Sequence, residues 1–289
     1  MTKPVLNKST IVRSIQSGLR LVNVVSPATA ARTASWLFFR SPPRQPLTEP
    51  QAACLAQGRA ERLDTASGPV AVWRFGSGPR VVLQHGWGGW GAQLHAFVQP
   101  LVELGHEVVV LDAPGHGQSP GSQSSFPAMA DALEAVADGG HIELLIAHSL
   151  GCCGAILAVE RGLSVGAFVG IAGPAHPLDW FDAWMGAVVD DAAIELEKAR
   201  LERLNGWALD DIDTAMLASR RTEPMLWVHD TADREVAFEG GSEVVARWPG
   251  ARMHATTGLG HRRILENPDI VDTVLAFHRE VREPARLSG

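Results

Sequence analysis

The chain has 289 residues, of which 46% are hydrophobic and 20% are charged, with 25 Lys and Arg against 32 Asp and Glu. This apolar content is enough for a large buried core, and it excludes a disordered chain, a collagen-like repeat and a small disulfide-stapled fold. The 3 cysteines, two of them adjacent at Cys152 and Cys153, provide neither a disulfide framework nor the spaced ligands of a zinc site. A reducing, cytoplasmic location is therefore expected.

Charge is distributed unevenly along the chain. Residues 1–50 contain seven Lys and Arg and only one acid, Glu49, whereas no Lys or Arg occurs between Arg80 and Arg161. Without a basic groove to neutralise phosphates, nucleic acid is not an expected partner. No stretch reaches the roughly 18 consecutive apolar residues of a membrane span. The apolar run at 21–31 is interrupted and lies far from Met1, so no secretion signal is expected.

Residues 1–50 predict a helical N-terminal extension. Apolar residues recur at helical spacing among basic ones, and Ser26-Pro27 is typical of an N-cap followed by a proline in the first turn. Two interpretations remain open for residues 1–40. Their apolar stripe packs on the main body of the protein, which we favour, or they form a basic amphipathic segment that makes weak contact with a membrane surface.

From residue 51 onward, the pattern changes to strands alternating with helices. The predicted strands are 61–66, 69–75, 80–84, 107–111, 142–147, 166–171, 224–228 and 252–256, and helices are expected near 93–104 and 126–138. Such alternation predicts an α/β fold with a mostly parallel sheet covered by helices on both faces.

Residues 174–221 interrupt this alternation, because they contain charged helical sequence and no strand-like run. They predict a helical cap insertion, which divides the core into residues 51–173 and 222–289. Trp180, Trp184 and Met216 line a substrate pocket in one interpretation. In the other they form the apolar underside on which the insertion packs.

Residues 144–151 read Leu-Leu-Ile-Ala-His-Ser-Leu-Gly and predict a buried strand, a small-x-Ser-x-Gly turn and a following helix. So sharp a turn requires small residues around the serine, and it exposes the Ser149 hydroxyl at the carboxyl end of the sheet. Here the chain resembles the serine-nucleophile, esterase- and lipase-like branch of the α/β-hydrolase fold family, over roughly residues 60–282. Ala147 replaces the usual first glycine of this motif.

Three further segments match the same family in order and in placement. Residues 81–89, Val-Val-Leu-Gln-His-Gly-Trp-Gly-Gly, resemble its oxyanion loop, which implies that the backbone N–H groups of Trp87 and Leu150 stabilise the developing charge. His85 and Asp112 are interpreted as structural. In residues 226–233 the family pattern selects Asp233 as the acid, with Asp230 as the competing candidate. His261, on the loop before the closing helix, is the expected base.

The residues together predict a serine hydrolase with the triad Ser149, Asp233 and His261. The expected substrate is a small or medium, largely apolar carboxylic ester, cleaved through an acyl-enzyme without cofactor or metal. Alternatives that use the same triad are a thioesterase, an acyltransferase and a carbon–carbon bond hydrolase. An interfacial lipase and a non-catalytic binding module are disfavoured. The substrate's identity and the oligomeric state cannot be predicted from the sequence.

Overall fold

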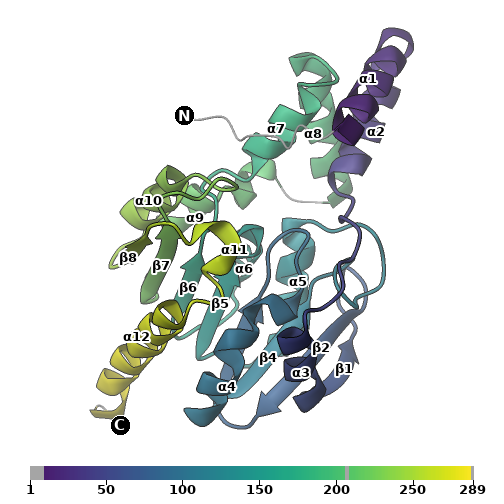
Figure 1. The fold of residues 1–289 in the computed structure, drawn as a ribbon. Coiled ribbons are helices and arrows are strands. Elements are labelled where there is room, and N and C mark those ends of the chain that lie inside the picture. The colour runs from purple at the N-terminus through teal and green to yellow at the C-terminus, as the bar shows by residue number, and fades with distance from the viewer. Residues whose placement is uncertain (1–9, 206–207, 288–289) are drawn as a thin grey trace. The chain divides into compact units, whose positions relative to one another are not determined.

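The structure, a computed structural model, describes residues 10–205 and 208–287 (Figure 1). By its internal contacts the chain divides into two compact units. One comprises residues 41–175 and 214–289, and the other residues 1–40 and 176–213. We call them the sheet unit and the helical unit and describe each by itself.

Within the described residues, eight strands form a single sheet in the order β1-β2-β4-β3-β5-β6-β7-β8. The strands β3 to β8 are parallel, whereas β2 pairs antiparallel with both β1 and β4. This arrangement confirms the predicted mostly parallel sheet. The strands are β1 (Arg59–Leu63), β2 (Val70–Gly76), β3 (Arg80–Gln84), β4 (Glu107–Asp112), β5 (Leu144–His148), β6 (Phe168–Ile171), β7 (Met225–Asp230) and β8 (Arg252–Thr256).

Helices cover the two faces of this sheet because the central strands are apolar on both sides. On one face, α4 (His95–Glu103) and α12 (Pro268–Leu287) pack on alternate strand residues such as Leu83 and Val110 (Figure 1). The intervening residues, such as Val82 and Val109, point to the opposite face. The remaining helices of the unit are α3 (Glu49–Gln57), the 3₁₀ turn η1 (Gly91–Leu94), α5 (Phe126–Ala137), α6 (Leu150–Glu160), α9 (Thr214–Ala218), α10 (Phe238–Arg247) and α11 (Gly260–Arg263).

The sheet unit contains two segments that the sequence assigned to the N-terminal extension and to the cap insertion. Residues 41–50 join it because Ser41 donates its backbone N–H to Ser122, and Arg44 donates to the carbonyl oxygen of Ser119 at 2.6 Å. Residues 214–221 join it through the Thr214 hydroxyl, which lies 3.1 Å from the Cys153 sulfur. The boundaries therefore differ from 50 and 174–221, since long-range hydrogen bonds leave no trace in local periodicity.

The helical unit consists of α1 (Thr10–Val25), α2 (Pro27–Phe38), α7 (Leu178–Met185), α8 (Asp191–Asn205) and the 3₁₀ turn η2 (Leu209–Ile212). Ser26 is the N-cap of α2 and Pro27 its first residue, as predicted. The core of the unit combines alanines of α2 with large side chains of α7 and α8, and the Trp184 indole N–H donates to the Ala34 carbonyl oxygen at 2.8 Å. The extension thus packs on the predicted insertion. Among the described residues, no helix is both long and apolar enough to span a membrane.

A buried histidine pair fastens α12 to the sheet unit. The His106 Nδ1–H donates to the Pro79 carbonyl oxygen at 2.9 Å, so its Nε2 accepts hydrogen bonds from the His278 Nε2–H at 2.8 Å and from Arg282 at 3.0 Å. This arrangement requires a neutral His106 imidazole, because its Nε2 accepts hydrogen bonds. Burial lowers the pKa of His278 to about 4 and also lowers the pKa of His106.

Protein stability should therefore fall as the pH drops from about 6.5 to about 4, because the unfolded histidines take up protons that the folded ones do not. Each such histidine contributes a slope of at most about 1.4 kcal/mol per pH unit. Urea unfolding of His278→Leu across this range should show a shallower slope than the unaltered protein. The exposed His141, changed in the same way, is the control, and equal slopes in both variants would contradict the prediction.

Candidate active site

Ser149 lies in a strained turn between β5 and α6. Its backbone has φ 55° and ψ −133°, a region that non-glycine residues rarely adopt. The surroundings explain the small neighbours of the motif. A Cβ at Gly151 would lie 2.3 Å from the His85 carbonyl oxygen, and one at Gly86 would lie 2.6 Å from the Ser149 Cβ. The loop after β3 therefore lies directly against the serine, with no room for larger residues.

His261 connects Ser149 to Asp233. It lies on α11, the short helix after β8, and its Nε2 is 3.0 Å from the Ser149 Oγ. Its Nδ1 is 2.8 Å from the Asp233 Oδ2, so Nδ1–H donates to the carboxylate and the lone pair of Nε2 faces the serine hydroxyl. The structure thus brings together the three residues predicted to form the triad.

The side chain of Asp233 is buried and held in place by its own loop. Its Oδ1 accepts hydrogen bonds from the backbone N–H groups of Glu235 at 2.8 Å and Val236 at 3.0 Å. Burial opposes the negative charge, but the nearby His229 Nε2 and the hydrogen bond from His261 outweigh it and lower the pKa of Asp233. The side chain is therefore a carboxylate at neutral pH, as stabilisation of a protonated His261 requires.

Asp230, the competing candidate, has a different set of partners. It accepts hydrogen bonds from the Thr256 hydroxyl at 2.7 Å and the Leu259 N–H at 2.8 Å, and further bonds from the backbone of Ala232 and Gly258. Through these bonds Asp230 fixes the loop that leads from β8 to His261.

Two residues interpreted as structural also have structural partners. His85 donates from Nδ1 to the Gly86 carbonyl oxygen at 2.7 Å and accepts the Ala113 N–H on Nε2 at 2.9 Å, and burial lowers its pKa to about 4. Asp112 accepts the backbone N–H groups of Gly91 and Gln118, both at 2.7 Å. His85 thereby fixes the loop that lies against Ser149, and Asp112 fixes the backbone at Gly91 and Gln118.

The predicted oxyanion donors lie on elements that flank the serine. Leu150 is the first residue of α6, and the N–H groups of a helix's first turn have no partner within the helix. Trp87 follows Gly86 in the loop that abuts Ser149, and its ring packs edge-on against His116 at 5.2 Å between centroids. The role of both N–H groups remains a prediction.

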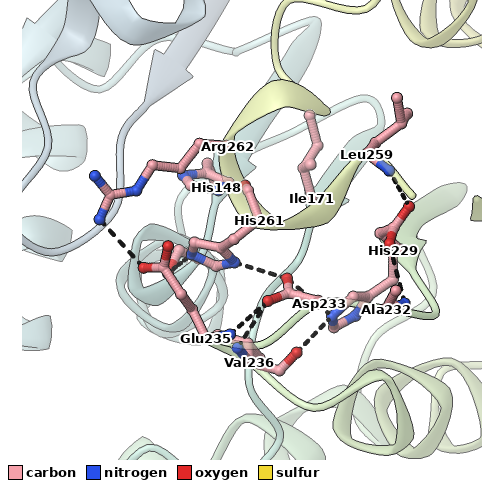
Figure 2. A network of polar contacts seen from close by, with 12 residues as sticks. His148, Ile171, His229, Ala232, Asp233, Glu235, Val236, Leu259, His261 and Arg262 are labelled. Carbon is pink, nitrogen blue, oxygen red and sulfur yellow. Dashed lines mark hydrogen bonds and ion pairs between the residues drawn. The ribbon is translucent and has the colours of Figure 1, made fainter. Parts of the chain in front are cut away.

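Two histidines near the triad were not singled out from the sequence. His148 donates from Nε2 to the carbonyl oxygen of His261 at 3.0 Å, and burial together with the neighbouring His261 lowers its pKa to about 3. His229 lies on the other side of Asp233, with its Nε2 3.6 Å from Oδ2 (Figure 2). Both lie near the carboxyl ends of buried strands. A polar residue at such a position was the sequence feature that could have identified them as site residues.

Three residues were predicted to line a pocket. Trp180 and Trp184 lie on α7 in the helical unit, where Trp184 packs against the core of that unit, and Met216 lies on α9 in the sheet unit. The pocket itself remains a prediction. Among the described residues, no group of three or more His, Cys, Asp or Glu side chains is arranged to hold a metal ion.

Comparison with known proteins identifies the fold. A family model described as the alpha/beta hydrolase fold matches residues 79–195. Among solved structures, the esterase EaEST from Exiguobacterium antarcticum aligns with a TM-score of 0.59 and 17% identity, covering 76% of this chain and 100% of its own. A putative lipase from Acinetobacter baumannii aligns with a TM-score of 0.61 and 18% identity, covering 83% and 99%. The chain therefore has the α/β-hydrolase fold, as its sequence predicted.

More specific sequence likeness is confined to a short segment. Over 70 residues the chain is 43% identical to the pimeloyl-[acyl-carrier protein] methyl ester esterase of Aeromonas salmonicida. The counterpart from Aeromonas hydrophila is 41% identical over 70 residues. These matches cover 23% of this chain and 27% of each relative. The chain therefore spans about a quarter of the length of the curated relatives it matches.

Proposed function

We propose that the chain is a serine hydrolase that cleaves carboxylic esters of small or medium, largely apolar acyl groups. The observation that carries this proposal is the continuous chain of contacts from Ser149 through His261 to Asp233, at 3.0 Å and 2.8 Å. The likeness to methyl ester esterases over 70 residues supports an ester as the substrate class.

The mechanism follows from the tautomer of His261. Nε2 takes the proton of the Ser149 hydroxyl as Oγ attacks the acyl carbon, and the Asp233 carboxylate stabilises the resulting imidazolium. The carbonyl oxygen becomes negative and accepts hydrogen bonds from the N–H groups of Trp87 and Leu150. His261 then gives its proton to the leaving alcohol, and water releases the acyl group from Ser149 by the same steps.

Labelling with a fluorophosphonate, followed by a series of p-nitrophenyl esters graded by acyl length, tests this proposal. We expect one covalent label on Ser149 and turnover of the short and medium esters. Parallel assays with acyl thioesters and with a carbon–carbon bond substrate distinguish the alternative uses of the triad. A preference for either of these by kcat/KM would reassign the reaction, and absence of labelling would argue for a non-catalytic protein.

The predicted pocket residues offer a second test, because Trp180 and Trp184 differ in their packing. The indole of Trp184 packs in the helical core and bonds to Ala34, so Trp184→Ala should destabilise the protein by about 3 kcal/mol. Trp180→Ala should shift the preferred ester towards longer acyl chains, with a gain of about 1 kcal/mol for each methylene accommodated. An unchanged chain-length profile in both variants would place the pocket elsewhere.

A further inference from the structure

Only part of the apolar surface of α1 is buried. Leu19 is buried and Ile15 half-buried against the core of the helical unit. At the end of the same helix, Leu21 is 73% exposed, Val24 83% and Val25 87%. The exposed apolar residues continue across Ser26 into the first turn of α2. We call this set the α1–α2 tip; it consists of Leu21, Val22, Val24, Val25, Pro27 and Ala28.

The helices that carry the tip have a single sign of charge. Neither α1 nor α2 contains an acidic residue, whereas Arg13, Arg20 and Arg32 are exposed on them. Trp36 on α2 is 47% exposed, and the guanidinium of Arg40 lies 5.2 Å from the centre of its ring. Tryptophan and arginine side chains with apolar bodies and polar ends are favoured where water meets lipid.

We propose that the α1–α2 tip binds the surface of a bilayer that contains anionic lipid. The tip would insert its exposed side chains among the acyl chains, while Arg13, Arg20 and Arg32 remain at the level of the headgroups. The basic charge of α1 and α2 favours an anionic bilayer over a second copy of the chain as the partner of the tip. Two copies joined by their tips would bring like charges together, whereas an anionic surface attracts all of them.

This surface differs from the part of α1 that packs on α2, α7 and α8. The buried face of α1 packs within the helical unit. Lipid contact, the other interpretation left open for residues 1–40, is proposed for the exposed face. Binding of this kind needs no spanning helix. It weakens as salt screens the arginines.

Flotation of the full chain with vesicles tests the proposal without reference to catalysis. The vesicles are made of phosphatidylcholine alone or of phosphatidylcholine with phosphatidylglycerol as the anionic lipid. We expect binding to the anionic vesicles only, and a decrease when salt is raised. Replacing one exposed arginine, as in Arg32→Ala, should lower the partition coefficient about fivefold.

The apolar contribution is tested by Leu21→Ser combined with Val25→Ser, which should lower partitioning at least about tenfold. The matched control is Leu196→Ser with Leu204→Ser on α8, where the leucines are 73% and 68% exposed but stand among glutamates. Both double variants should keep the thermal stability of the unaltered protein, since these side chains are exposed.

Three results would overturn the proposal. The first is an absence of flotation with anionic vesicles at low salt, which tests the unaltered protein and does not depend on how the variants fold. The second is equal partitioning of the two double variants. The third is self-association without lipid that is abolished by Leu21→Ser with Val25→Ser, which would assign the tip to a second copy of the chain.

Discussion

Ser149→Ala should lose fluorophosphonate labelling completely and lower ester turnover by roughly 10⁴-fold to 10⁶-fold. The variant lacks the oxygen that forms the acyl-enzyme, and among the described residues no other hydroxyl lies within hydrogen-bonding distance of the His261 imidazole. Folding should be preserved, because the substitution keeps the Cβ atom. Its cost to stability is the loss of the hydrogen bond between Oγ and Nε2.

Two other variants at serine positions sharpen this test. Ser164→Ala removes an exposed serine that bonds to His141, and it should retain both labelling and turnover. Ser149→Gly should be as inactive as Ser149→Ala but unfold at a higher temperature, because glycine adopts the positive φ of this turn without strain. Turnover by Ser149→Ala at the rate of the unaltered protein would refute the proposed mechanism.

The sheet and the order of the candidate residues were accessible from the sequence because both depend on local patterns. A buried strand is a short apolar run, and the turn at Ser149 requires small residues at fixed positions on either side of it. Since the carboxyl ends of parallel strands meet at one edge of the sheet, residues after β3, β5, β7 and β8 were expected to converge there.

What escaped prediction depends on contacts between distant residues. His148 and His229 look like ordinary members of buried strands, and only the fold shows that one holds the backbone of His261 and the other flanks Asp233. The sequence also did not predict which helices the N-terminal helices pack against. The stripe of α1 predicts that one face is buried, but it does not predict which helices cover that face.

The choice between Asp233 and Asp230 shows what a sequence motif alone can predict. Both aspartates follow β7, and the spacing after His229 favours Asp233 only by analogy with the family. The structure separates them by their partners, since the carboxylate of Asp233 meets an imidazole and that of Asp230 meets hydroxyl and backbone donors. The two residues should therefore fail in different ways when altered.

Asp233→Asn should lower kcat by about 10⁴-fold, a loss of activity that far exceeds its loss of stability. An asparagine oxygen can still accept the N–H groups of Glu235 and Val236 that now bond to Oδ1. Its amide N–H₂ then faces Nδ1 of His261 and favours the tautomer that carries the proton on Nε2. In that tautomer the imidazole cannot accept the Ser149 proton, and no carboxylate remains to stabilise the imidazolium.

Asp230→Asn should show the opposite pattern. Its two oxygens accept N–H groups from Ala232, Gly258 and Leu259 in addition to the Thr256 hydroxyl. An amide group in place of one oxygen turns an acceptor into a donor that faces other donors, at a cost of about 1–3 kcal/mol. We expect a lower unfolding temperature and a loss of activity well below 10⁴-fold, which arises because the loop before His261 is less firmly held.

Thermal unfolding and kcat, measured on both variants, separate the two roles. Thr256→Val provides the matched control for Asp230, because it removes one of the same hydrogen bonds without introducing a new donor. Like Asp230→Asn, it should lower the unfolding temperature and reduce kcat only modestly, with a smaller loss of stability. If Asp230→Asn instead abolished turnover at full stability while Asp233→Asn remained active, Asp230 would be the residue that orients His261, and the contact between Asp233 and Nδ1 would not be the one used in catalysis.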